Sequence, residues 1–221
     1  MKNKKIYMVG IGGIGMSALA QLFAAQGVAV SGSDREESPV TRVLVQKGVS
    51  VVVGQAAANV PKDASLVIYS DAVPQDNPER ARARELGIPE QSYFQALGEA
   101  AKTKRTIAVA GTHGKTTTTA MLGRMLIDAR LDPTVVVGSI VTEWGSNFRQ
   151  GKSDLFVVEA CEYRSHFLAF KPEVLVITNV EFDHTDFFKS LAEVQAAFGE
   201  ARAQAKQVVE QKDYSAVTVP E

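Results

Sequence analysis

The sequence has little of several features that would place a protein in a specialised class. One cysteine, Cys161, stands among 221 residues, so an intramolecular disulfide is excluded. Lys and Arg number 24 against 25 Asp and Glu, so no overall charge attracts nucleic acid or an anionic membrane surface. No apolar run approaches the roughly 18 residues that span a bilayer, and no secretory signal precedes the first apolar run. We therefore expect a cytoplasmic protein with no nucleic-acid partner and no membrane insertion.

What remains is the composition of an ordinary globular chain, with 45% hydrophobic and 22% charged residues. Short apolar runs alternate with segments of helical composition, and this alternation predicts an α/β fold with parallel strands. The predicted strands are Lys5–Gly10, Val28–Ser33, Val49–Val53, Leu66–Tyr69, Thr106–Ala110, Thr134–Gly138, Leu155–Glu159 and Val174–Asn179. The predicted helices are Ile14–Gln26, Pro78–Leu86, Ser92–Lys102, about Thr117–Ala129 and about Leu191–Val209.

The pattern of strand, tight turn and helix begins twice, which predicts two sheets and two domains. We place the boundary near residue 101, giving domains 1–101 and 102–221. The second sheet has only about four identifiable strands, which is few for a sheet of this kind. This predicts an open sheet edge and marginal stability or self-association of the second half.

The first turn is rich in glycine and lies between a predicted strand and a predicted helix. Gly10, Gly12 and Gly15 occupy it, and glycines at such a turn let the backbone approach a diphosphate at the helix N-terminus. Asp34 closes the second strand, where a dinucleotide-binding fold places the acid that accepts ribose hydroxyls. The pattern fits NAD and a UDP-sugar equally well, and a tight turn without a ligand is the plain structural alternative.

The second turn is a phosphate loop of variant type. Gly111–Thr116 follows a strand and opens a helix, and its Gly-Lys-Thr end is typical of loops in which backbone amides and a lysine hold phosphates while a hydroxyl reaches Mg²⁺. The common pattern has a glycine five residues before Gly114, but that position is Val109 here. The preceding glycine, Gly111, comes only three residues before Gly114.

Two further side chains follow buried strands and are expected at the same sheet edge as the phosphate loop. Glu159 and His184 are a carboxylate and an imidazole that could complete the coordination of one or two Mg²⁺ ions on phosphate oxygens. Asp183 and Asp186 are candidates for orienting groups, although for Asp186 we favour a cap of the following helix. Cys161 is interpreted as a small buried side chain, because no base for a thiolate is evident.

Four segments together carry a family resemblance. They are G-I-G-G-I-G-M-S at Gly10–Ser17, A-G-T-H-G-K-T-T-T-T at Ala110–Thr119, E-A-C-E-Y-R-S-H-F-L at Glu159–Leu168 and T-N-V-E-F-D-H-T-D at Thr178–Asp186. In this order they resemble the Mur ligases of peptidoglycan synthesis over nearly the whole chain. The tail after about Gln211 matches nothing in the family. Cys161 and Tyr163–His166 replace acidic residues common in other members, which leaves the roles of Arg164 and His166 open.

The resemblance implies a ligase that uses ATP and Mg²⁺ and takes UDP-N-acetylmuramate and L-alanine as substrates. In such enzymes the γ-phosphate passes to the substrate carboxylate, and the amine attacks the resulting acyl phosphate. Lys115 would then stabilise the moving phosphoryl group, Thr116 and Glu159 would bind one Mg²⁺, and His184 with Glu159 a second. The implied ATP-binding residues are Gly111, Thr112, His113, Gly114, Lys115, Thr116 and Thr117. The implied UDP-sugar-binding residues are Gly10, Gly12, Gly13, Gly15, Met16, Ser17 and Asp34.

The family has three domains, and the resemblance implies that 1–101 is the Rossmann-like UDP-sugar domain and 102–221 is part of the central ATP-binding domain. The C-terminal domain for the amino acid has no counterpart, so we expect this chain by itself to be an inactive portion of the ligase. Three alternatives stay open: a recycling ligase that joins a tripeptide to the same UDP-sugar, a non-catalytic UDP-sugar-binding module, and an NAD-dependent oxidoreductase. The sequence does not indicate an oligomeric state.

Overall fold

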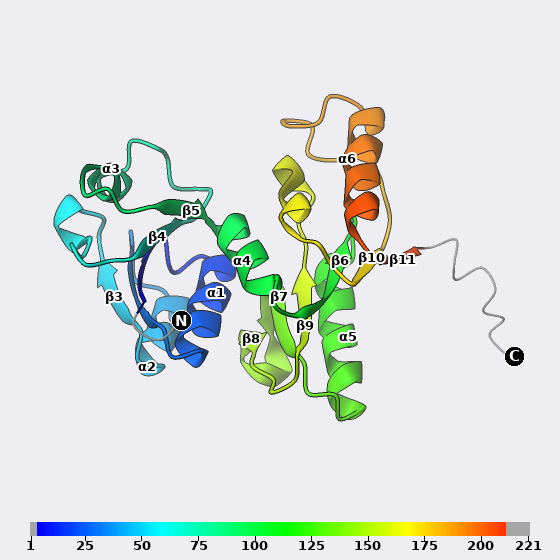
Figure 1. Ribbon diagram of the computed structural model, residues 1–221, viewed down its shortest axis with the longest axis horizontal. Helices are drawn as coiled ribbons and strands as arrows, with labels where there is room; N and C mark the ends of the chain where they lie inside the picture. The colour runs from blue at the N-terminus through cyan, green and yellow to red at the C-terminus, as the bar shows by residue number, and fades with distance from the viewer. Residues whose placement is uncertain (1–3, 211–221) are drawn as a thin grey trace, which may run out of the picture. The chain divides into compact units, whose positions relative to one another are not determined.

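The computed structural model describes residues 4–210, which form two compact units (Figure 1). The first comprises the chain up to Leu97 together with Thr142–Phe148, and the second comprises Gly98–Val141 and the chain from Arg149. None of the helices within residues 4–210 is both long enough and apolar enough to cross a bilayer.

The first unit is built on a parallel sheet of five strands in the order β3-β2-β1-β4-β5. Its elements are β1 (Lys5–Val9), α1 (Ile14–Ala25), β2 (Ala29–Asp34), α2 (Pro39–Gln46), β3 (Ser50–Val53), the 3₁₀ turn η1 (Ala57–Asn59), β4 (Leu66–Tyr69), α3 (Pro78–Glu85), β5 (Glu90–Ser92) and α4 (Tyr93–Ala101). The α/β class predicted from the sequence is confirmed, and the strand order is that of a doubly wound nucleotide-binding fold.

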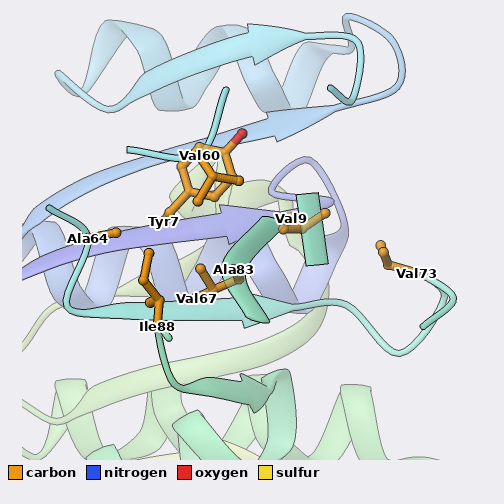
Figure 2. Close-up of a cluster of buried hydrophobic side chains, with 8 residues drawn as sticks. All are labelled: Tyr7, Val9, Val60, Ala64, Val67, Val73, Ala83 and Ile88. Carbon is orange, nitrogen blue, oxygen red and sulfur yellow. The ribbon is translucent and has the colours of Figure 1, made fainter. Parts of the chain in front are cut away.

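One face of this sheet carries an apolar cluster that α3 covers (Figure 2). Successive side chains of a strand point to opposite faces, so Tyr7 and Val9 of β1 share this face. The members of the cluster are Tyr7, Val9, Val60, Ala64, Val67, Val73, Ala83 and Ile88, all of them at most 9% exposed. Because the cluster joins β1, β4, α3 and the chain after η1, burying these side chains fixes α3 against the sheet.

Glu79 lies beside the cluster and is the most deeply buried charged side chain of the first unit, at 0% exposure. Its carboxylate accepts hydrogen bonds from Tyr7 Oη (2.9 Å), Asn59 Nδ2 (2.8 Å), Ala56 N (3.2 Å) and Ser33 Oγ. Burial and the neighbouring charge of Glu79 raise the pKa of the Tyr7 phenol, so this hydroxyl stays protonated and can donate. Glu79 also lies in the first turn of α3, where a negative charge is favoured.

The second sheet has six strands in the order β11-β10-β6-β9-β7-β8, and the five strands other than β8 lie in the second unit. The elements from β6 onward are β6 (Arg105–Ala110), α5 (Lys115–Asp128), β7 (Thr134–Val141), η2 (Thr142–Trp144), β8 (Ser146–Arg149), β9 (Leu155–Glu159), η3 (Tyr163–Ala169), β10 (Val174–Ile177), α6 (Leu191–Gln204) and β11 (Gln207–Glu210). Of these, η2 and all of β8 except Arg149 belong to the first unit. Strands β6, β7, β9, β10 and β11 pair in parallel, which brings their carboxyl ends to one edge.

Two sequence-based expectations for these sheets are wrong. The second sheet has six strands rather than about four, because β8 and β11 are short and four residues long each. The helix expected to reach Val209 ends at Gln204, and the residues that follow pair with β10 as β11. The first sheet likewise gains β5, a three-residue strand that pairs with β4. The tail after about Gln211 lies outside the described residues.

Glu79 generates a prediction about stability. Glu79→Ala leaves several buried donors without an acceptor, so we expect the free energy of unfolding to fall by about 3 kcal/mol. Urea denaturation followed by circular dichroism measures this change. Glu85→Ala on the same helix is the matched control, because the Glu85 side chain is 65% exposed. Equal losses for the two variants would contradict the role assigned to Glu79.

Candidate functional site

The phosphate loop predicted from the sequence connects β6 to α5. Gly111 has φ +134° and Gly114 has φ +79°, both in the region that side-chain-bearing residues rarely adopt. A Cβ on Gly111 would lie 2.0 Å from Thr178 Oγ1, so only glycine fits there. Gly114 is the N-cap of α5, and the first backbone bond of the helix runs from Thr118 N to Gly114 O (2.9 Å). The preceding amides, at Lys115, Thr116 and Thr117, are those that a helix N-terminus offers to an anion.

The residues after β10 hold this loop in place. Asn179 Oδ1 accepts from His113 N (2.8 Å), and Asn179 O accepts from Thr112 N (3.1 Å). Thr178 Oγ1 donates to His113 O (2.6 Å). Thr112 and His113 thus hold the loop shape through their backbone atoms, and the Thr112 hydroxyl adds a contact by accepting from Glu181 N at 2.9 Å.

Lys115 is held from three directions. Its Nζ donates to Gly111 O (2.6 Å) and Thr112 O (2.9 Å), which folds the side chain back over the loop. The same ammonium lies 2.9 Å from one carboxylate oxygen of Glu162 and 3.0 Å from the other. Glu162 is 2% exposed, so the pair is largely removed from water and its attraction is little screened. The lysine charge is therefore fixed at the mouth of the phosphate loop.

Thr116 and Glu159 are brought together as the sequence predicts. Thr116 Oγ1 lies 3.0 Å from Glu159 Oε1, at the carboxyl end of β9. Glu159 Oε2 accepts from Gly138 N of β7 at 2.7 Å. A Cβ on Gly138 would lie 2.6 Å from this carboxylate, so the glycine is what permits the contact.

His184 lies beside Glu162, a residue that the sequence analysis did not single out. His184 Nε2 is 3.3 Å from Glu162 Oε1, so the buried Glu162 carboxylate contacts both His184 and Lys115. His184 has φ +53°, and Asp183 Oδ1 accepts from its backbone amide at 2.7 Å. Residue spacing carries no signal for Glu162. Its role follows from burial, because a buried carboxylate needs a partner for its charge, and burial cannot be read from spacing.

The donors at this edge fit Mg²⁺ bound together with phosphates. Thr116 and Glu159 supply hard oxygen donors. Within residues 4–210, no group of three or more His, Cys, Asp or Glu side chains is gathered as a metal site made of protein alone. Mg²⁺ characteristically takes one or two carboxylates and completes its shell with water and substrate phosphates, and Thr116 and Glu159 are donors of the kind it prefers.

Two neighbouring residues, Asp186 and Cys161, differ in how well they fit the interpretation made from the sequence. Asp186 does not cap the next helix, because the N-cap of α6 is Ser190. Instead Asp186 Oδ2 accepts from Tyr163 Oη (2.6 Å), and this hydrogen bond lowers the pKa of the Asp186 carboxyl. Burial raises the pKa of the half-buried Cys161 thiol, which disfavours a thiolate there.

The first unit has its own cavity, of about 460 Å³, at the carboxyl edge of its sheet. Gly10, Gly12, Gly13 and Asp34 are among its lining residues. Asp34 Oδ2 accepts from Gly12 N at 2.8 Å, which ties the end of β2 to the glycine turn.

The other predicted residues of the glycine turn lie outside the lining of this cavity. A Cβ on Gly15 would lie 2.6 Å from the Tyr93 ring, so this glycine allows α1 to pack closely against α4. Met16 and Ser17 are 2% and 1% exposed within α1. Both side chains are buried in α1, and neither lines the cavity.

Comparison with known proteins gives two family matches in tandem. The "Mur ligase family, catalytic domain" matches residues 5–105, and the "Mur ligase middle domain" matches residues 109–210. UDP-N-acetylmuramate--L-alanine ligases from Desulfitobacterium hafniense and Clostridium kluyveri are 52% and 46% identical over 88% and 90% of this chain. The chain spans less than half of each relative, 43% and 44% of their lengths.

Solved structures agree with these matches. A UDP-N-acetylmuramate-alanine ligase from Thermotoga maritima is 38% identical with a TM-score of 0.84, over 93% of this chain and 48% of that one. The UDP-N-acetylmuramate:L-alanyl-gamma-D-glutamyl-meso-diaminopimelate ligase from Neisseria meningitides is 31% identical with a TM-score of 0.83, over 91% of this chain and 68% of that one. Together with the phosphate loop and its carboxylates, these similarities show that the chain belongs to the Mur ligase family.

Proposed function

We propose that the chain is the sugar-nucleotide-binding and phosphate-binding portion of an ATP-dependent ligase that joins L-alanine to the carboxylate of UDP-N-acetylmuramate in the cytoplasm. The observation that carries this proposal is the phosphate loop with Lys115 at its mouth and the Thr116–Glu159 pair beside it. This arrangement suits transfer of a phosphoryl group to an acceptor, the step that activates a carboxylate for amide formation.

Each residue of the loop has a distinct part in this proposal. The amides at the start of α5 and the Lys115 ammonium would bind the phosphates of ATP, and the lysine would stabilise charge that develops on the transferred group. Thr116, Glu159 and His184 would hold Mg²⁺, which when bound neutralises phosphate charge. Glu162 would keep Lys115 and His184 in position. We assign these roles to residues 102–221 and sugar-nucleotide binding to residues 1–101.

The choice of L-alanine over a tripeptide rests on the relatives. The curated L-alanine ligases are up to 52% identical to this chain, whereas the ligase that takes an L-alanyl-γ-D-glutamyl-meso-diaminopimelate peptide is 31% identical. A complete enzyme containing this chain, assayed with L-alanine and with the tripeptide, distinguishes the two. Faster turnover of the tripeptide would favour the recycling ligase.

The first test concerns the ligand of the amino-terminal unit. We expect the chain to bind UDP-N-acetylmuramate and not NAD, because the glycine turn needs only a diphosphate and the relatives named for their substrates act on this UDP-sugar. Isothermal titration calorimetry with each ligand measures the two affinities. Lys115→Ala is the control and should leave the UDP-sugar affinity unchanged. Measurable NAD affinity without UDP-sugar binding would overturn the assignment.

The second test concerns Lys115. Lys115→Ala should weaken ATP binding to the chain by roughly tenfold or more, because a charged hydrogen-bond donor to the phosphates is lost. Fluorescence titration with a labelled ATP gives the dissociation constant. Lys171→Ala, at an exposed lysine of the same unit, is the matched control. Equal ATP affinities for the two variants would mean that this loop is not the phosphate site.

The third test concerns Mg²⁺. If Glu159 is a ligand of Mg²⁺, then Mg²⁺ should raise the ATP affinity of the original chain but should raise that of Glu159→Ala about tenfold less. The comparison uses titrations in Mg²⁺ and in EDTA, and exposed Glu200→Ala serves as the control. An unchanged Mg²⁺ effect in Glu159→Ala would remove this residue from the proposed site.

A further inference from the structure

One residue that lines the cavity of the first unit, Gln55, contacts the residue that begins α3. Asn77 is the N-cap of this helix, and Pro78 follows it at the first helical position. Asn77 Oδ1 accepts from Glu79 N (2.9 Å) and Arg80 N (3.3 Å). Only the oxygen of an amide can accept, so capping fixes which end of the Asn77 side chain faces the helix.

The other end of Asn77 is therefore a donor, and it orients a second amide. Asn77 Nδ2 donates to Gln55 Oε1 at 2.8 Å. Gln55 lines the cavity. With its oxygen occupied by Asn77, the Gln55 side chain retains its Nε2 amide, which carries two N–H donors. Within residues 4–210, this nitrogen donates to no protein acceptor.

The backbone around Gln55 is also fixed to α3 and its surroundings. Ala56 N, the next amide, donates to the buried Glu79 carboxylate at 3.2 Å. Asn59 Nδ2 donates to Gly54 O at 3.0 Å and to Glu79 at 2.8 Å. Gln55 is thus presented from a turn that is tied down on both sides, so the placement of its amide requires little ordering when a ligand binds.

We propose that Gln55 is a binding residue for the uridine diphosphate part of the sugar nucleotide, and that Asn77 is the positioning residue that turns the Gln55 amide nitrogen toward it. The inference rests on the proposed function, which places a sugar nucleotide in this cavity. Uridine diphosphate offers acceptor oxygens on its phosphates, its ribose and both uracil carbonyls. A neutral amide with its nitrogen free matches any of these acceptors.

The test uses UDP as the probe and calorimetry on the 221-residue chain. Gln55→Ala should weaken UDP binding by about three- to tenfold, the effect of one hydrogen bond. Gln55→Glu should weaken it more, by about tenfold or more, because a carboxylate oxygen then faces the acceptor oxygen of the ligand. The Asn77 contact survives in Gln55→Glu, since a carboxylate still accepts from Asn77 Nδ2.

Asn77→Asp separates positioning from folding. Aspartate caps a helix as well as asparagine does, so the melting temperature should stay close to that of the original chain. The new carboxylate accepts from Gln55 Nε2, which reverses the Gln55 amide and turns its oxygen to the ligand. We expect Asn77→Asp to lose UDP affinity in the original background and to add no further loss in Gln55→Ala.

Parallel titrations with uridine, UMP and UDP locate the acceptor. A Gln55→Ala loss already present with uridine assigns it to the base or ribose, and a loss that appears only with UMP or UDP assigns it to a phosphate. Either result supports the proposal. Unchanged UDP affinity in Gln55→Glu, or an equal effect of Asn77→Asp with and without the Gln55 side chain, would overturn it. If the original chain binds neither UDP nor UDP-N-acetylmuramate, this result contradicts the proposed sugar-nucleotide binding of residues 1–101 as well.

Discussion

A carboxylate that leaves water must gain donors or a cation in return, and both units of this chain bury one. In the first unit Glu79 collects neutral donors from β1, the end of β2 and the turn that contains η1. In the second unit Glu162 faces an ammonium and an imidazole instead. The segments that line the cavity and the side chains at the phosphate loop are arranged around these two groups.

The two carboxylates differ in the kind of groups that surround them. The partners of Glu79 are a backbone amide and neutral side-chain donors of the first unit. The partners of Glu162 are the ends of longer side chains, and the three N–H groups of the Lys115 ammonium donate to Gly111 O, Thr112 O and Glu162. To bind a phosphate while keeping the contact to Glu162, Lys115 would have to exchange its contact with Gly111 O or Thr112 O for a phosphate oxygen. The same physical requirement is thus met by neutral donors in the first unit and by an ammonium and an imidazole in the second.

Sequence patterns predict the parts of this molecule that depend on neighbours in the chain. Strand, turn and helix recur twice, and the Gly-Lys-Thr loop is readable because its chemistry is contained in six residues. Strands β5, β8 and β11 were missed because each has only three or four residues and is defined by its partner strand. Glu162, Gln55 and Asn77 were missed because burial and amide orientation, which have no period in the sequence, determine what they do. The assignments of the remaining site residues stay predictions.

Gly138 gives the second sheet a further property. Strands β7 and β9 are parallel neighbours, with Val136 opposite Val158, and two residues later the Gly138 amide meets the carboxylate that follows Val158. A slip of one residue along either strand would place a Cβ and a different amide against Glu159. The position of this carboxylate therefore depends on the alignment of the two strands, and the slip that displaced it would also turn the side chains of the strand to the opposite face.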